Sequence, residues 1–584
     1  MHSSVGERGA TLLDAVVGTA LMLIVFIGIV GAFRLTVMVV SNNKARAGAV
    51  ALANERLEYI RSLSYSAIGT VGGIPAGTIP QTEPVSLNAV DYTRRTFVSY
   101  EDDPGDGIGG ADSNGVTADF KAAKVTVSWT VRDGVHTITL ITRISPPTGV
   151  EASVPGGTLS INVQDSLAAA IQSAQVRIIN SSLTPNINLT TFTDAAGNAT
   201  LIGAPAGAGY QVVATKAGYS SAQTYSASST NTNPSPANLG VSLNQTTAST
   251  FAIDLISTKT IETYLPVTRA TTTEPFTLDS GIASSTKITV AGGVARLTAD
   301  AGAYPASGMF ISTLVSTSSL VRWQEFSFVH LKPSGTNIFY RIYDANGTNL
   351  IPESQLPGNA AGFTTSPVNL STVATSSYAA LTVHATLTTS NASNTPSIDS
   401  WSISDDSGPS PLKNVALTLR GTKTIGSGPS GTLYKYDNQS LSSGASGSVT
   451  VNDLEFDSYT VGVAASTTRV ISSACDPQPE ALSANSTQTT RIYLSPYTTN
   501  SLLVDVKSAA GTTIPNASVR LFRASPAYST TITSDSCGQS FFSGIAAGTG
   551  GSAYSIQVSA TGFVTFDSAT VNVSGTSRLS VILN

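Results

Sequence analysis

Charged residues are scarce in this chain: Asp, Glu, Lys and Arg make up 11% of its 584 residues, whereas soluble proteins contain about a quarter. Ser, Thr, Gly and Ala take their place. The net charge is −5 and no basic block occurs, which argues against a nucleic-acid partner. This composition is typical of extracellular β-rich modules rather than of a cytosolic enzyme, and the length requires several domains.

Groups that could carry catalysis are also few. No Cys/His spacing suits zinc, no Gly-rich loop carries a phosphate-binding Lys, and no Gly-x-Ser-x-Gly elbow lies between a strand pattern and a helix pattern. We therefore expect a protein that is not an enzyme and has no cofactor, apart from the calcium considered below. The four histidines are isolated along the chain: His2, His136, His330 and His384.

The only two cysteines are Cys475 and Cys537. In an exported chain, two such residues predict one disulfide, which here would staple neighbouring modules. A pair of buried free thiols is the alternative.

One long uncharged run stands near the start of the chain, from Ala15 to Phe33. Its length is that of a helix crossing the bilayer core. Asp14 precedes it, and a carboxylate at the start of such a helix is costly in lipid and is expected to have a partner. The apolar spacing continues in amphipathic form, which predicts one helix from about Thr11 to Leu63. Its first half belongs in a membrane or fibre and its second half in a head domain.

The residues before this run resemble the type IV prepilin family. Met1–Gly9 matches a polar leader that ends in Gly, Ala10 is the first mature residue, and Asp14 is the fifth. The family usually has Phe as the first mature residue, where this chain has Ala10, and Glu as the fifth, where this chain has Asp14. The resemblance implies cleavage after Gly9 by a prepilin peptidase that also N-methylates Ala10.

The same resemblance implies that the Asp14 carboxylate pairs with the Ala10 ammonium group of a neighbouring subunit. An unpaired carboxylate is penalised in a low-dielectric helix bundle, so this pair would set the register of assembly. The alternative is a plain single-span anchor in which Asp14 lies at the membrane interface.

Strand patterns begin after the helix, at residues 93–100, 121–132 and 135–144. They predict a small antiparallel sheet packed on the second half of the helix, as in a pilin head. Between the first two lies a loop rich in Asp and Gly. Calcium prefers several oxygen ligands on a tight loop, although the spacing is not that of an EF-hand and turns use the same residues. The possible calcium ligands are Asp102, Asp103, Asp106, Asp112, Asn114 and Asp119.

Four sequence blocks recur in the same order in residues 157–224 and 501–563. They are an alternating strand, a strand with a Val-Arg pair, an Asp-x-x-Gly turn, and a strand that ends in Gly and an aromatic residue. A third, weaker copy begins at Pro411. These blocks resemble carboxypeptidase-regulatory-like repeats and the B-type repeats of Gram-positive surface adhesins. The resemblance implies small seven-strand, prealbumin-like β-sandwiches without peptidase activity.

Residues 258–404 show a different strand pattern, which weakly resembles a jelly-roll or galactose-binding-like sandwich. Such folds often bind carbohydrate through exposed aromatic side chains, and Trp323 and Trp401 are the candidates. A Trp in a β-sandwich is more often part of the core.

The predicted fold class is multidomain and mostly β, with a long N-terminal helix packed on a small antiparallel sheet and β-sandwich modules after it. The predicted divisions are a leader (1–9), a pilin helix and head (10–147), a regulatory-like sandwich (148–257), a jelly-roll-like sandwich (258–404), an Ig-like or prealbumin-like sandwich (405–497) and a second regulatory-like sandwich (498–584).

The function that the patterns favour is a minor pilin or pseudopilin. It would be anchored in the membrane by its helix, join other pilin subunits in a type IV pilus-like filament at the cell surface, and display sandwiches that bind a glycan or another surface ligand. Two alternatives stay open. One is a single-span anchor that does not assemble, and the other is a carbohydrate-binding subunit of a secretion complex.

Overall fold

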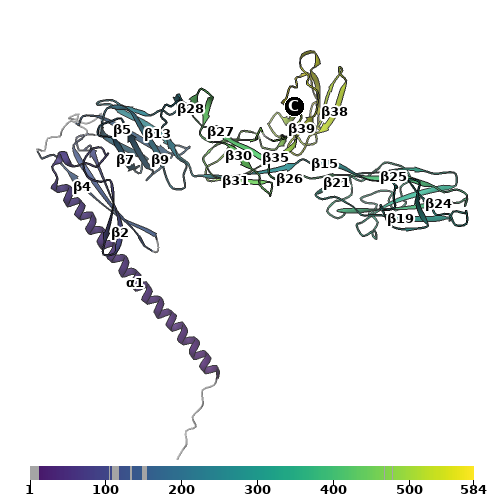
Figure 1. Ribbon diagram of the computed structural model, residues 1–584, viewed down its shortest axis with the longest axis horizontal. Coiled ribbons are helices and arrows are strands. Elements are labelled where there is room, and N and C mark those ends of the chain that lie inside the picture. Colours follow the sequence, from purple (N-terminus) through teal and green to yellow (C-terminus); the bar gives the residue numbers. More distant parts are fainter. Residues whose placement is uncertain are drawn as a thin grey trace, which may run out of the picture.

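A computed structural model describes residues 12–103, 105–107, 118–131, 134–147, 154–465, 467–476 and 478–584. The fold is mostly β: a single long helix at the N-terminal end is followed by antiparallel sheets arranged as β-sandwiches. The parts form an extended molecule, with the helix at one end (Figure 1).

The head consists of the second half of helix α1 (Leu12–Ser62) and a four-stranded antiparallel sheet in the order β1-β2-β3-β4. The helix buries small and branched residues against the sheet, among them Ala49, Ala53 and Ile60. The approach is close: a Cβ at Gly48 would lie 2.6 Å from the hydroxyl of Tyr92. A 3-10 turn follows the helix and then the strands: η1 (Tyr65–Ala67), β1 (Thr82–Leu87), β2 (Val90–Glu101), β3 (Phe120–Val131) and β4 (Gly134–Ile144).

The next unit, residues 154–256, is called sandwich 1. Its two sheets have the orders β13-β5-β8 and β10-β9-β6-β7, with β12 also paired to β9. Alternate residues of each strand face a core of Val, Ile, Leu and Tyr210, as the alternating pattern predicts. The strands are β5 (Gly157–Gln164), β6 (Gln175–Asn180), β7 (Ile187–Phe192), β8 (Asn198–Ala204), β9 (Gly207–Thr215), β10 (Ala222–Gln223), β11 (Asn233–Pro234), β12 (Leu239–Val241) and β13 (Thr246–Ala252).

Sandwich 2 is discontinuous in sequence and corrects one predicted boundary. We expected a separate sandwich to begin at residue 258, but β14 (Ser257–Leu265) pairs with β26, β31 and β35 instead. Residues 257–265 and 409–497 therefore form one sandwich, whose first strand is separated from the others by an insertion. The other strands are β26 (Ser410–Pro411), β27 (Ala416–Gly421), β28 (Thr424–Gly428), β29 (Gly431–Tyr434), β30 (Asp437–Ser442), β31 (Ser448–Leu454), β32 (Asp457–Val463), β33 (Arg469–Ala474), β34 (Glu480–Leu482) and β35 (Thr487–Pro496).

The insertion, residues 266–408, is a sandwich with its own aromatic core and is called the inserted sandwich. One sheet has the order β17-β18-β25-β21-β23, with β15 also on β25; the other has the order β16-β19-β24-β20, with β22 on β24. The strands are β15 (Thr268–Glu274), β16 (Ile282–Thr286), β17 (Ile288–Ala291), β18 (Val294–Leu297), β19 (Ser307–Ser312), β20 (Val315–Ser316), β21 (Leu320–Leu331), β22 (Thr336–Tyr343), β23 (Val368–Asn369), β24 (Ala380–Thr389) and β25 (Ser397–Ser407).

Residues 498–584 form the C-terminal sandwich, which lies beside sandwich 2, while the inserted sandwich occupies the far end of the molecule (Figure 1). The sheets of the C-terminal sandwich, β39-β36-β42 and β38-β37-β40-β41, repeat the strand order of sandwich 1. The strands are β36 (Ser501–Ser508), β37 (Ser518–Arg523), β38 (Tyr528–Thr533), β39 (Gln539–Ser543), β40 (Tyr554–Ser559), β41 (Phe566–Val571) and β42 (Thr576–Leu583).

Candidate functional site

The first half of α1 extends beyond the head and is apolar on all sides. Large apolar side chains are exposed along the whole stretch from Val16 to Val40, with Met22 75% and Phe33 69% exposed. In the part of the chain that the structure describes, one helix is long and apolar enough to cross a membrane. A helix that is apolar all round requires lipid or other apolar helices around it.

The predicted processing residues cannot be placed by the structure. Gly9 and Ala10 lie outside the described residues, and of Asp14 only the helical backbone is described.

The second half of α1 is fixed to the sheet by buried charge pairs as well as by apolar contacts. Arg56 on the helix forms an ion pair with Glu83 on β1. Arg94 on β2 pairs with the same carboxylate at 3.0 Å and donates to the carbonyl of Leu52 at 3.2 Å. Two guanidinium groups sharing one carboxylate tie the helix to two strands, so the exposed half of the helix projects rigidly from the head.

Three of the predicted calcium ligands come together at the end of the head. Asp102, Asp106 and Asp119 each place one carboxylate oxygen so that all three lie within 4.8 Å of one another. Asp103 is not in this group; its carboxylate accepts from the N–H of Gly105. Asp112 and Asn114 lie outside the described residues. Three convergent carboxylates suit a hard cation such as calcium.

Lys121, which the sequence analysis did not single out, lies buried beside this group. Its ammonium donates to the carbonyls of Tyr65 and Ile68, both at 2.7 Å. Burial lowers the pKa of Lys121 to about 8. Burial also raises the pKa of Tyr65 to about 12, with Tyr100 and Asp119 contributing in the same direction. The sequence does not distinguish Lys121 from Lys124, the exposed lysine of the same strand.

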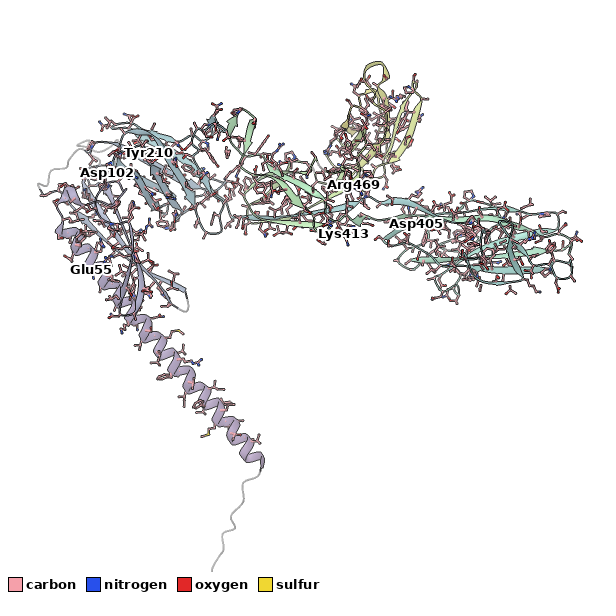
Figure 2. The ribbon with its side chains drawn as sticks, viewed as in Figure 1. Glu55, Asp102, Tyr210, Asp405, Lys413 and Arg469 are labelled. Carbon is pink, nitrogen blue, oxygen red and sulfur yellow. A yellow bond between two sulfur atoms is a disulfide. The ribbon has the colours of Figure 1, made fainter. Side chains whose placement is uncertain are left out.

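The head and sandwich 1 share packed residues. Ile74, from the loop after α1, is 3% exposed and belongs to the core of sandwich 1. The Arg95 guanidinium lies 4.5 Å from the ring centre of Phe192 on β7. The approach is also close at Gly203, where a Cβ would lie 2.7 Å from the side chain of Val154 and 3.2 Å from the Tyr100 ring of the head. Asp102 is at this same junction (Figure 2).

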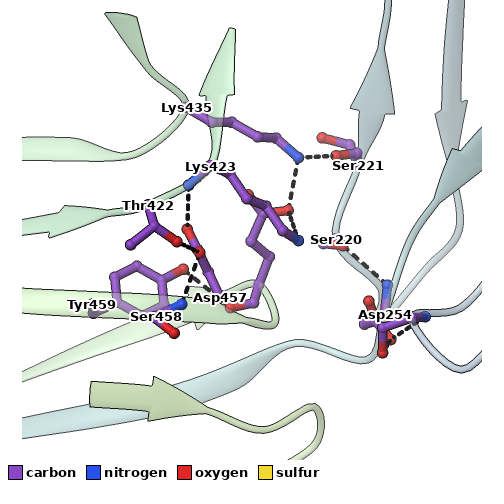
Figure 3. A network of polar contacts seen from close by, with 11 residues as sticks. Ser220, Ser221, Asp254, Thr422, Lys423, Lys435, Asp457, Ser458 and Tyr459 are labelled. Atoms are coloured by element: carbon purple, nitrogen blue, oxygen red, sulfur yellow. Dashed lines mark hydrogen bonds and ion pairs between the residues drawn. The ribbon is translucent and has the colours of Figure 1, made fainter. Parts of the chain in front are cut away.

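Sandwich 1 and sandwich 2 are joined by strand pairing and by charge. The residues of β11 pair antiparallel with β28, and the Asn231 amide donates to the carbonyl of Ile425 at 2.8 Å. Lys435 of sandwich 2 donates to the carbonyl of Ser221 of sandwich 1 (Figure 3). The same ammonium pairs at 2.7 Å with Glu455, which also holds Lys423 at 3.4 Å. A cavity of about 270 Å³ lies at this joint.

Cys475 and Cys537 form a disulfide between sandwich 2 and the C-terminal sandwich. Next to it, the Gln539 side chain accepts from the backbone N–H of Ala474 at 2.7 Å and donates to Asp505. The bond lies at the border of the two sandwiches and joins residues 62 positions apart in the chain.

The tryptophans proposed for carbohydrate binding lie in the core of the inserted sandwich. Trp323 is completely buried and its indole N–H donates to the carbonyl of Tyr378 at 2.8 Å. Trp401 is 2% exposed and packs 6.4 Å from Phe326, centre to centre. Neither ring offers a surface on which a sugar could stack, so the expected role of these residues is wrong. The outward positions of their strands are occupied by other residues.

Two adjacent carboxylates stand where the inserted sandwich meets sandwich 2 (Figure 2). Burial disfavours ionisation of Asp406, but hydrogen bonds from Arg269, Arg322 and Gln324 outweigh it and lower its pKa. Asp405 points to the other side of the strand and is 2% exposed. Burial, with a smaller contribution from Asp406, raises the pKa of Asp405. Asp406 on β25 thus joins three strands of the inserted sandwich, since Arg269 lies on β15 and Arg322 and Gln324 lie on β21.

No family model matches the chain, and no curated protein matches it. Several solved structures are similar to it at low identity. The TIE protein of Bacillus anthracis is 10% identical over 86% of this chain and 73% of its own, with a TM-score of 0.15. BcpA, the major pilin subunit of Bacillus cereus, is 10% identical over 74% and 99%, with a TM-score of 0.14. GBS52, the minor pilin of Streptococcus agalactiae, is 9% identical over 58% and 96%, with a TM-score of 0.16. At these TM-scores no conclusion about function rests on the likeness.

Proposed function

We propose that the protein is a membrane-anchored subunit that assembles through helix α1 into a type IV pilus-like filament and carries its β-sandwiches at the cell surface. The observation that carries this proposal is the division of α1. Its first half is apolar on every side, and its second half is fixed to a small antiparallel sheet. A helix of this kind can be held by lipid before assembly and by neighbouring helices afterwards.

The N-terminal motif supports the type IV mechanism in particular. Cleavage after Gly9 leaves the Ala10 ammonium five residues from the Asp14 carboxylate, counting both. In a bundle of apolar helices these opposite charges pair between subunits, because neither is stable alone in a low-dielectric environment. The partners are therefore a prepilin peptidase with methyltransferase activity and other pilin subunits.

The sandwiches serve display and adhesion. They extend away from the helix, and the inserted sandwich stands farthest from it (Figure 1). Modules of this bulk crowd a close-packed fibre, which favours a low copy number or a position at the tip. A glycan or another surface component is the expected class of ligand.

Mass spectrometry of the mature N-terminus tests the proposal. We expect a chain that begins at Ala10 and carries one added methyl group. A chain that begins at Met1 would support a surface anchor that does not assemble. A chain that begins after residue 40 would remove the pilus argument altogether.

Asp14→Ala tests assembly itself. We expect the variant to remain in the membrane and to be absent from sheared filaments, because the intersubunit pair is lost. Asp14→Glu is the matched control and should be incorporated normally, since it keeps the charge. Normal incorporation of the Ala variant would contradict the pairing.

A further inference from the structure

The edge strands β7 and β38 are equivalent in sandwich 1 and the C-terminal sandwich. Each pairs antiparallel with the second strand of its own sandwich and ends its sheet. The registers also agree: Arg177 faces Thr190 across β6 and β7, and Arg520 faces Thr531 across β37 and β38. Structural positions can therefore be transferred from one edge to the other.

The edge of β7 is closed by the head. The N–H of Asn188 donates to the carbonyl of Gly72 at 2.9 Å, and its carbonyl accepts from the Gln81 amide at 2.7 Å. Two residues further along, the N–H of Thr190 donates to Gln81 at 3.4 Å, and its carbonyl accepts from Arg95. Asn188 and Thr190 are thus the outward-facing residues of β7, and one neighbouring unit satisfies both.

The equivalent residues of β38 are Ser529 and Thr531. Among the described residues, neither has a backbone hydrogen bond to a unit outside its own sandwich. The strand Tyr528–Thr533 contains no proline and no charged residue, and it pairs with β37 without a bulge. Prolines, charged side chains and bulges usually protect natural edge strands from pairing with another chain, and this strand has none of them. This edge lies on the outer side of the C-terminal sandwich and is free to accept another strand (Figure 1).

A positively charged hollow of about 530 Å³ adjoins this edge and is lined by Arg520, Phe522, Arg523, Tyr528 and Ser529, among others. The Arg520 side chain reaches across to β38, where its Nε donates to Ser529 at 3.2 Å. Its guanidinium lies 4.6 Å from the ring centre of Phe522.

The charge of this hollow is not compensated. Arg523 donates only to backbone carbonyls, those of Pro526, Ala547 and Ser552. Within the described part of the chain, no carboxylate lies within ion-pair distance of Arg520 or Arg523. The hollow therefore favours a carboxylate supplied from outside the chain.

We propose that the β38 edge is a docking site for an extended, acidic segment of a partner polypeptide. The segment adds as a strand beside β38, hydrogen-bonds with Ser529 and Thr531, and places a Glu or Asp side chain near Arg520. In such strand addition the main chain supplies affinity and side-chain hollows supply specificity. The site does not depend on α1 entering a filament, so failure of the filament proposal leaves it intact.

Fluorescence anisotropy with the full chain in detergent tests this site. The probes are labelled ten-residue peptides of alternating Thr and Val with a single Glu at the centre, and the same peptides with Lys there. We expect the Glu peptide to bind at least tenfold more tightly than the Lys peptide. Thr531→Pro removes one outward N–H without breaking the ladder to β37 and should weaken binding of the Glu peptide at least tenfold.

Arg520→Gln separates the contribution of the Arg520 charge from that of the main-chain hydrogen bonds along β38. It should abolish the preference for Glu over Lys while both peptides still bind. The matched control is Arg420→Gln, because Arg420 also stacks on an aromatic ring, 4.4 Å from Tyr434, but lies in sandwich 2. This control should bind as the unmodified chain does.

Three results would overturn the proposal. One is no binding of the Glu peptide up to millimolar concentration. Another is equal binding of the Glu and Lys peptides. The third is a dimer in sedimentation that Thr531→Pro dissociates, because the edge would then pair with a second copy of this chain. Thr531→Glu, with its fold checked by circular dichroism, guards against an effect of proline on folding: it places a carboxylate opposite Arg520 and should also weaken binding of the Glu peptide.

Discussion

Sandwich 1 and the C-terminal sandwich share one strand order but differ in what closes their borders. Sandwich 1 is held by packing and hydrogen bonds on two sides, with Ile74 of the head in its core and Lys435 of sandwich 2 on its other side. The C-terminal sandwich is held to its neighbour by a disulfide and a glutamine side chain, and its β38 edge stays open. The repeated pattern builds the core, and a few border residues decide whether a module is an internal link or an attached unit.

Ile74→Ala should break the first border and have the largest effect. Replacing a buried isoleucine by alanine costs about 2–5 kcal/mol of unfolding free energy, and here the loss falls on sandwich 1 and releases the head. Chemical denaturation together with limited proteolysis between the head and sandwich 1 measures both consequences. Val71→Ala is the control, since Val71 is in the same loop and 57% exposed. Equal stability of the two variants would contradict the shared core.

Cys537→Ala should weaken the border between sandwich 2 and the C-terminal sandwich, because it removes the disulfide. It gives the Asp-x-x-Gly turn of the C-terminal sandwich the residue that sandwich 1 has there, Ala196. Loss of a disulfide typically costs about 2–4 kcal/mol, so the C-terminal sandwich should melt earlier. Calorimetry gives the shift, and the mass after thiol alkylation gives the oxidation state of Cys475. An alkylated Cys475 in the unmodified chain without reductant would show free thiols.

Glu455→Gln should loosen the joint between sandwich 1 and sandwich 2 by a smaller amount. The change leaves Lys423 and Lys435 without their shared counter-charge, and both are partly exposed, so the expected loss is about 1 kcal/mol. Faster amide hydrogen exchange at β28, with no change in the C-terminal sandwich, is the expected result. The control is Glu262→Gln, which removes an exposed pair with Arg491 away from this joint.

Removal of calcium by a chelator should have the smallest effect. It tests whether the head carries a bound cation where it meets sandwich 1. If the carboxylates of Asp102, Asp106 and Asp119 hold calcium, a chelator leaves them to repel one another. The head should then melt a few degrees lower at most, a shift that corresponds to less than about 1 kcal/mol in a domain of this size. Asp119→Asn should make the head insensitive to the chelator. An unchanged melting curve of the unmodified chain would show that no calcium is bound.

The local structure followed closely from the sequence, because period-2 and helical patterns report which side of an element is buried. The amphipathic continuation of the apolar run predicted that α1 ends near Leu63, and it ends at Ser62. Both strong copies of the four blocks form sandwiches with the same pairing. The boundary at residue 258 was wrong because the first strand of sandwich 2 is separated from its partners by a whole domain, and a pattern read along the chain cannot show such pairing.

The sites followed less closely, because they depend on what folds against each residue. Trp323 has the residue type of a sugar platform but faces inward, because a register shift between Trp323 and Glu325 brings it to the same face as Phe326 and Phe328. Strict alternation along the strand would have placed it on the opposite face. Lys121 and Ile74 acquire their roles only from the elements packed on them. The disulfide was predicted from the number of cysteines alone. No sequence pattern marks Lys423, Lys435 and Glu455 as the residues that join sandwich 1 to sandwich 2.

The insertion within sandwich 2 has a mechanical consequence. The chain enters the inserted sandwich after β14 and leaves it at β26, and these strands are hydrogen-bonded to each other at Tyr264–Pro411 and Leu265–Ser410. A pull on the inserted sandwich therefore reaches sandwich 2 through two strands side by side and continues along β14 toward sandwich 1 and the helix. The C-terminal sandwich lies outside this tensile path, so it keeps its shape, and its open edge, while the rest of the chain bears load.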